Sequence, residues 1–484
     1  MHWIKKSVVL LGTCMLAGCV DLRPVKPGST GGNPITGEEK KVNRSDDDYS
    51  TDFAVEKQKQ TEQVNQLMSL ISAHYSKISK AEMDVATETK WNDKTVTSHL
   101  KTQEKYEEGT LKGYYIENET KAADESIKQE YYYNGEKYFL NVDKMAWQEL
   151  KGSTKTPTVY LYLVKLMLEG NDVIEVEDGL SQLHMTKKVT DAELLESIYQ
   201  YIDFPMMLTP NAIKTVTLDY QVDDENGTIS VATIRLEAND LGQTIQHSVQ
   251  IRTNTNAEFA DWKIDTAAEF AGVDTESAEF AQYFKEKNPT KALTYYELYT
   301  NQIDGDDTQT TLVLGNYFVG VPYMAVEGTV KDSELSDTSL IAQQKRYALD
   351  KENVATSDVT FENYYEYFVN RVLEKHDVLD ALEVDEESDV YVLRELFEYD
   401  LESFQAAAGK VDISHLVREG DAVYGVDYRI DRKTQQLVSV YLWATTPGEG
   451  NVSTLTTLNF SRFNAINPNL VLGNIDKKLW DVLK

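Results

Sequence analysis

The feature that most constrains this chain is that its sequence repeats itself. The segment YLVKLMLEGNDV at Tyr162–Val173 matches YFVNRVLEKHDV at Tyr367–Val378, with six identical residues. Further along, LDYQVD at Leu218–Asp223 matches VDYRID at Val426–Asp431, in the same order and at nearly the same spacing. Two such blocks indicate a duplicated unit of about 210 residues. We therefore expect two similar domains, at residues 56–272 and 273–484.

The N-terminus has the order of residues found in an export signal. Lys5 and Lys6 precede an apolar stretch over residues 8–17, and the stretch ends at Leu16-Ala17-Gly18-Cys19. A stretch of this length is short for the roughly 30 Å of hydrocarbon that a permanent transmembrane helix crosses. We therefore predict a cleaved signal peptide at residues 1–18.

The tetrapeptide that ends at Cys19 resembles the lipobox of bacterial lipoproteins. The resemblance implies cleavage between Gly18 and Cys19 and diacylglycerol on the Cys19 sulfur, which would anchor the chain to the membrane at its extracytoplasmic face. The alternative is an ordinary signal peptide whose cysteine is incidental. Residues 19–55 are rich in Gly, Pro, Ser, Thr and charge, which is typical of a flexible polar tether.

Composition limits both the fold and its partners. At 484 residues and 41% hydrophobic, the chain is long enough for two or more apolar cores. Cys14 and Cys19 are its only cysteines, so the exported part can form no internal disulfide and must depend on those cores. The formal net charge of −32 repels phosphate backbones and anionic headgroups, which disfavours nucleic acid as a partner.

Periodicity predicts the same elements in each unit. The first unit should contain a helix from Val64 to Tyr75, an alternating strand from Met83 to Trp91, and a hairpin with a type I′ turn at Asn134-Gly135. Two helices should follow, one over residues 157–168 and one opened by the capping box of Thr190 and Glu193. The predicted closing strands span residues 216–222, 229–236 and 245–253 in the first unit, and 424–430, 437–443 and 452–460 in the second.

The second unit should open with a helical stretch from Phe280 to Tyr299. Two more helices are predicted in it, one carrying Phe361 to Val372 and one carrying Leu393 to Phe404 and ending at Gly409. Strands with short connections form antiparallel meanders, and helices inserted between them must cover an apolar face. The predicted fold class is therefore α+β.

The order of a lipobox, a tether, a helix, an aromatic hairpin (YYYNGEKYFLNVDKMAWQEL), two helices and a meander (VDYRIDRKTQQLVSVYLW) resembles the LolA-like superfamily, including LppX-type lipoproteins. The resemblance implies that each domain is a curved antiparallel half-barrel sheet, with helices covering its concave face and enclosing an apolar cavity for acyl chains. Residues 302–354 depart most from that pattern.

No catalytic, cofactor or metal motif is found. Ser98-His99-Leu100-Lys101 matches S-x-x-K, but the flanking sequence favours a strand, and the companion motifs of penicillin-binding enzymes are absent. Asp304-Gly305-Asp306-Asp307 lacks the spacing of an EF-hand and favours a polar turn. The seven histidines show no HExxH spacing.

These observations favour a non-enzymatic carrier or sensor that binds a lipid, a glycolipid or another apolar molecule. The alternative is a protein-interaction module that binds a protein of the cell envelope. A solute-binding lipoprotein of an importer would show alternating βα units in place of meanders. An envelope hydrolase would need a catalytic motif that the sequence lacks.

Overall fold

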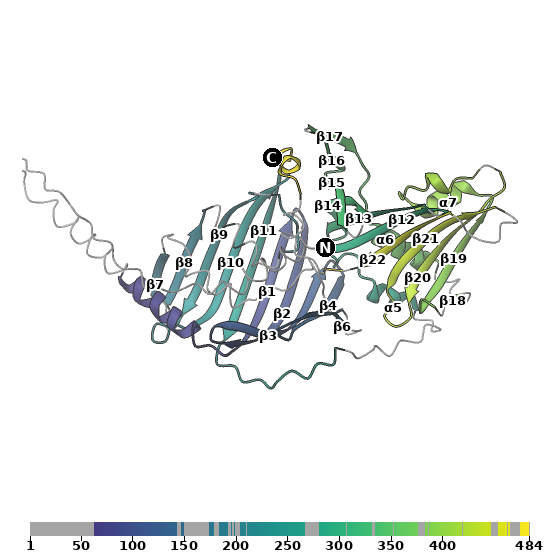
Figure 1. Ribbon diagram of the computed structural model, residues 1–484. Coiled ribbons are helices and arrows are strands. Elements are labelled where there is room, and N and C mark those ends of the chain that lie inside the picture. The colour runs from purple at the N-terminus through teal and green to yellow at the C-terminus, as the bar shows by residue number, and fades with distance from the viewer. Residues whose placement is uncertain are drawn as a thin grey trace, which may run out of the picture.

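The computed structural model contains two antiparallel sheets of eleven strands each (Figure 1). It describes residues 62–142, 147–149, 174–178, 183–191, 195, 198, 204–209, 211–266, 280–305, 307–331, 334–351, 353–375, 383–385, 387–418, 420–446, 454–461, 463–464 and 475–483. Gly18, Cys19, the tether and the domain boundaries at residues 55/56 and 272/273 lie outside these ranges, so those assignments stay predictions.

The first sheet runs from purple to teal in Figure 1 and has the order β6-β5-β4-β3-β2-β1-β11-β10-β9-β8-β7. Its strands are β1 (Lys80–Trp91), β2 (Lys94–Glu107), β3 (Thr110–Ala122), β4 (Glu125–Tyr133), β5 (Tyr138–Val142), β6 (Trp147–Glu149), β7 (Ile174–Asp178), β8 (Leu183–Val189), β9 (Ile213–Val222), β10 (Ile229–Asp240) and β11 (Gln243–Asn254).

The second sheet, green to yellow, has the order β17-β16-β15-β14-β13-β12-β22-β21-β20-β19-β18. Its strands are β12 (Tyr295–Asp304), β13 (Asp307–Phe318), β14 (Val321–Lys331), β15 (Glu334–Ala342), β16 (Lys345–Asp350), β17 (Asn353–Asp358), β18 (Glu383–Asp385), β19 (Val390–Glu398), β20 (Val423–Asp431), β21 (Leu437–Thr445) and β22 (Thr454–Ser461).

The two sheets share one strand order. In each, the first strand of the unit lies between the second strand and the last, because β1 pairs with β2 and β11, and β12 pairs with β13 and β22. The part of the sequence expected to depart most from the pattern, residues 302–354, forms β13 to β16 and occupies the same places as β2 to β5.

Alternation along the strands explains why these segments form sheets. In β1, Met83 and Val85 are buried while Asp84 and Ala86 are exposed, so one face packs and the other meets solvent. The strands predicted in the closing part of both units are confirmed as β9 to β11 and β20 to β22, each within a few residues of the expected bounds.

The expected balance of helix and strand needs correction, because the described part of the chain is mostly strand. Its helices are short: residues 62–75, α5 (Phe280–Lys287), α6 (Tyr364–Glu374), α7 (Leu401–Ala408), the 3₁₀ turn η3 (Ser414–Leu416) and α9 (Lys477–Asp481). Helices covering the concave face of each sheet are not confirmed. The helix expected over residues 157–168 lies outside the described residues, and of the next one only Leu195 and Ile198 are described, both as helical.

Two predicted helices in the second unit are wrong in extent. Residues 390–398 form strand β19, paired with β20, and the helix begins only after Asp400, whose side chain accepts a hydrogen bond from the Ser403 N–H at 3.0 Å. The helix that opens at Phe280 ends at Lys287, because Asn288 precedes a proline and leaves the helical region. By Tyr295 the chain has become strand β12.

The hairpin between β4 and β5 is confirmed, but its turn differs from the predicted type. Gly135 has φ +95°, whereas Asn134 is not in the left-handed region, as a type I′ turn would require. The Asn134 side chain accepts hydrogen bonds from the N–H groups of Glu136 and Lys137 at 3.0 and 2.9 Å, which closes a four-residue loop instead.

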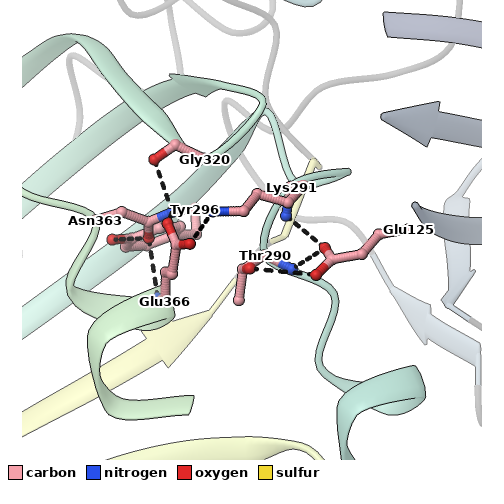
Figure 2. A network of polar contacts seen from close by, with 7 residues as sticks. All are labelled: Glu125, Thr290, Lys291, Tyr296, Gly320, Asn363 and Glu366. Atoms are coloured by element: carbon pink, nitrogen blue, oxygen red, sulfur yellow. Dashed lines mark hydrogen bonds and ion pairs between the residues drawn. The ribbon is translucent and has the colours of Figure 1, made fainter. Parts of the chain in front are cut away.

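A polar network joins the two units (Figure 2). Glu125, the first residue of β4, accepts hydrogen bonds from the N–H groups of Thr290 and Lys291 at 2.6 and 2.5 Å. The Lys291 side chain pairs with Glu366 on α6, and the N-cap of that helix, Asn363, accepts hydrogen bonds from the Glu366 N–H at 3.1 Å and the Tyr296 hydroxyl at 3.2 Å. The first unit is thereby tied to a helix of the second.

A second contact between the units is buried. Asp240, at the end of β10, accepts hydrogen bonds from the hydroxyls of Thr209 and of Tyr323 on β14. The Trp91 ring lies edge-on to Phe318 and Tyr323, with centroids 5.8 and 5.4 Å apart. Aromatic packing and a buried carboxylate meet here, so the two units are also in contact through buried side chains.

Candidate functional site

The candidate site is the buried face of the first sheet, which is the face that carries Val85, Ile116 and Ile234. One half of this face, formed by β8 to β11 and β1, is largely apolar. Its side chains are almost fully buried, and they include Met83, Val85, Met185, Val189, Val216, Leu218, Tyr220, Val222, Ala232, Ile234, Leu236, Ile245, Val249 and Ile251. The buried polar exceptions on these strands are Thr87, Lys187, Asp240 and the pair of Thr89 and His247, which are joined by a 2.8 Å hydrogen bond.

The other half of the same face, on β2 to β4, is also buried but mixes polar with apolar side chains. Thr102 is 1% exposed, Asn118 7% and Gln129 2%. The register places Asn118 between Leu100 and Gln129 on the neighbouring strands, and Thr102 opposite Ile116, so these groups form one patch. Strands of this kind ordinarily present apolar side chains to a core.

Three atoms in this patch have no hydrogen-bond partner among the described residues: the Thr102 hydroxyl, the Tyr114 hydroxyl and the Asn118 side-chain oxygen. Tyr114, Ile116 and Asn118 follow one another on the same face of β3. Burial raises the pKa of the Tyr114 hydroxyl well above its usual value, so this group stays protonated and can donate as well as accept. We call Thr102, Tyr114 and Asn118 the polar patch.

The polar patch lies next to the second unit. Gln129, opposite Asn118, donates a hydrogen bond to the backbone carbonyl of Phe463 at 3.5 Å. In the second unit the corresponding strands carry stacked rings: Tyr296 of β12 stacks on Tyr317 of β13, with centroids 4.7 Å apart. The two units therefore present different interiors within one strand order.

The residues singled out from the sequence do not form a catalytic or metal site. Ser98 bonds to Thr120 at 3.0 Å, whereas Lys101, three residues further along β2, points to the opposite face, so the two cannot converge. Asp304, Gly305 and Asp307 belong to the hairpin between β12 and β13. Within the described ranges there is no group of His, Cys, Asp and Glu that could hold a metal ion, and no helix is long and apolar enough to cross a membrane.

Sequence reasoning missed the polar patch. Along β2 both sides of the strand are rich in polar residues, so alternation does not show which side is buried. The pairing of β2 with β3 shows that Thr102 and Asn118 lie on the same face as Leu100 and Ile116. The sequence alone does not give this pairing.

Comparison with known proteins gives likenesses to solved structures only, because no family model and no curated protein matches the sequence. Lipoprotein LppX from Mycobacterium tuberculosis is similar at 11% identity and a TM-score of 0.22, over 39% of this chain and 97% of LppX. LprF from Mycobacterium bovis is similar at 8% identity and a TM-score of 0.21, over 38% of this chain and 90% of LprF. In the MucA/MucB complex of Pseudomonas aeruginosa, the matched chain has 11% identity and a TM-score of 0.20, over 62% of this chain and 91% of that one.

The LppX-type lipoproteins named from the sequence are thus among the structures that this chain resembles. At such TM-scores the likeness gives no residue-level correspondence. The function is therefore inferred from the residues of this chain.

Proposed function

We propose that this protein is a non-enzymatic lipoprotein, anchored through lipid on Cys19 at the extracytoplasmic face of the membrane, that holds an amphipathic lipid on the buried face of its first sheet. The acyl chains would lie on the apolar half formed by β8 to β11 and β1. The headgroup would contact the polar patch.

The observation that carries this proposal is the set of three buried polar atoms without a partner. A buried group left unsatisfied costs about 1–3 kcal/mol, and native proteins hold few of them. Three such atoms on one stretch of sheet, beside a wide apolar surface, fit a molecule that has both a hydrogen-bonding head and an apolar tail. The Asn118 oxygen only accepts, so the head should carry a hydroxyl or an amine.

The lipid can be sought directly in the purified full-length protein. Native mass spectrometry, followed by organic extraction and mass analysis of the extract, separates a non-covalent lipid from the acyl chains attached to the polypeptide. We expect about one non-covalent amphipathic lipid per chain. Protein that carries none would overturn the lipid-binding proposal and favour the alternative of a protein-interaction module.

The anchor has its own test. Replacing Cys19 with serine removes the sulfur that lipidation needs, so Cys19→Ser protein should move from the membrane fraction to the soluble fraction of the producing cells. Cys14→Ser, which keeps Cys19, is the matched control and should stay with the membrane. Equal membrane association of both variants would show that the anchor is not at Cys19, whatever the outcome of the lipid extraction.

A further inference from the structure

The exposed face of the first sheet, opposite the proposed lipid site, contains a groove of its own. Two adjoining hollows of about 540 and 280 Å³ lie on this face and share His99 and Glu119 in their lining. The larger one crosses β10, β11, β1, β2 and β3, which are neighbours in the sheet (Figure 1). The smaller one continues over β4, and its lining includes Asn118 and Gln129, between the outward-facing residues Glu117 and Glu119 of β3 and Lys128 and Glu130 of β4. We call the two together the outer groove.

Register brings the lining side chains into rows across the sheet. Ala86 of β1 pairs with His99 of β2 and with Gln250 of β11, and Glu88 pairs with Thr97 and with Ser248. Hydroxyl, amide and charged groups therefore alternate along the floor. The hollow offers both hydrogen-bond donors and acceptors at short intervals.

The lining of the outer groove holds four Lys or Arg side chains and four Glu side chains, and several of these charges are paired. Lys121 lies 3.2 Å from Glu119, and Arg235 lies 3.8 Å from Asp219. Glu88 is 2.6 Å from Lys90. Compensated pairs leave little net field, so the outer groove suits neither a polyanion nor a cation, and the overall charge of −32 repels anions further.

Aromatic rings border the outer groove at its β4 end. The Tyr115 hydroxyl donates a hydrogen bond to Glu130, which lines the smaller hollow, at 2.7 Å. Tyr132 pairs with Tyr115 on the same face, and its ring lies edge-on to Trp262 with centroids 6.1 Å apart. The indole N–H of Trp262 donates to Gln103 at 2.8 Å, which fixes the half-buried ring over β2. The Trp262 ring itself stacks on Phe259, with centroids 5.7 Å apart, and the Lys105 ammonium lies over it, 4.1 Å from its centroid.

We propose that the outer groove binds a neutral oligosaccharide. Such a ligand carries many hydroxyls and no charge, which matches a floor of paired charges, hydroxyls and amides. The site lies on the opposite face of the sheet from the proposed lipid site, so the protein would contact a glycan and a lipid at the same time.

The test uses the full-length protein in a detergent without a sugar headgroup, because a glycosidic detergent would compete. Chitohexaose, cellohexaose and maltohexaose are titrated separately by isothermal calorimetry. We expect saturable binding of at least one of them. The absence of binding by all three would overturn the proposal.

Matched variants locate the site. Gln250 lines the larger hollow, whereas Gln246 lies four residues away along β11, on the same exposed face and outside the lining. Gln250→Ala should weaken binding at least about fivefold, because a typical hydrogen bond contributes about 1 kcal/mol, and Gln246→Ala should leave it unchanged. Equal effects of the two substitutions would contradict the assignment. Non-covalent lipid content should stay constant in both, which separates this result from the proposal for the buried face.

Discussion

Asp240 is a buried carboxylate whose chemistry differs from that of a surface one. It is 1% exposed and lies between the units, with the Thr209 and Tyr323 hydroxyls donating to it. Burial raises the pKa of this carboxyl, and the hydrogen bonds offset only part of the rise. The folded state therefore binds the proton of Asp240 more tightly than the unfolded state does.

The raised pKa of Asp240 determines the direction in which the free energy of unfolding changes with pH. The contribution of Asp240 is most favourable below its ordinary pKa and is lost as the pH rises through the raised, folded-state pKa. Asp240→Asn, which cannot ionise, should thus gain stability relative to the wild type as the pH rises from about 4 to about 7. Urea unfolding of both proteins across that range measures the difference. A difference that stays constant with pH would show that the Asp240 pKa is not raised.

At the scale of elements, the helix over residues 62–75 depends on a turn of the first sheet. Gly227, between β9 and β10, has φ +74°, and a Cβ there would lie 2.5 Å from the backbone nitrogen of Ile71. Gly242, between β10 and β11, has φ +75° and nothing within 4 Å of the same position. Both glycines have nearly the same positive φ, which would strain any other residue, but only Gly227 has the helix packed against it.

Gly242 therefore serves as the control for a substitution at Gly227. Gly227→Ala and Gly242→Ala should both lose about 1–2 kcal/mol through the left-handed backbone. Gly227→Ala should lose roughly 1–3 kcal/mol more, because the helix must shift away. Denaturant unfolding of the two variants measures the difference. Equal losses would mean that the helix does not rest on this turn.

The sequence predicts an element correctly where its apolar residues follow one spacing, either that of a strand or that of a helix. It fails where the apolar residues of a segment fit both spacings. β1 and β9 to β11 alternate cleanly and are confirmed. In the second unit, Leu393, Leu396 and Phe397 fit a helical spacing, yet β-branched Val390 and Val392 begin the strand, and pairing with β20 decides the outcome. The polar patch could not be predicted, because the burial of Thr102 and Asn118 depends on which face of the sheet becomes covered.

At the scale of the whole molecule, we expect the contacts between the two units to make them unfold together. Glu125 provides a charged acceptor for two backbone N–H groups of the second unit, and hydrogen bonds to charged groups contribute about 1.5–3 kcal/mol. Glu125→Ala should therefore lower the free energy of unfolding by about 2 kcal/mol. The exposed Glu136, in the loop between β4 and β5, is the control, and Glu136→Ala should change it by less than about 0.5 kcal/mol.

Calorimetry tests whether the two units unfold together. Wild-type protein should unfold in one thermal transition, and Glu125→Ala should broaden it or divide it in two as the contact between the units weakens. Two separate transitions in the wild type would show that the units are independent.

The central claim, that the polar patch holds the head of a lipid, is tested most directly by comparing Asn118→Leu with Asn141→Leu. Both substitutions remove a buried amide whose oxygen has no partner among the described residues, but Asn141 lies on the opposite face of the sheet, beside Glu130. The measurement is the amount of non-covalent lipid extracted per purified chain. Asn118→Leu should lose most of the lipid and Asn141→Leu should retain it, whereas equal retention in both would contradict the claim.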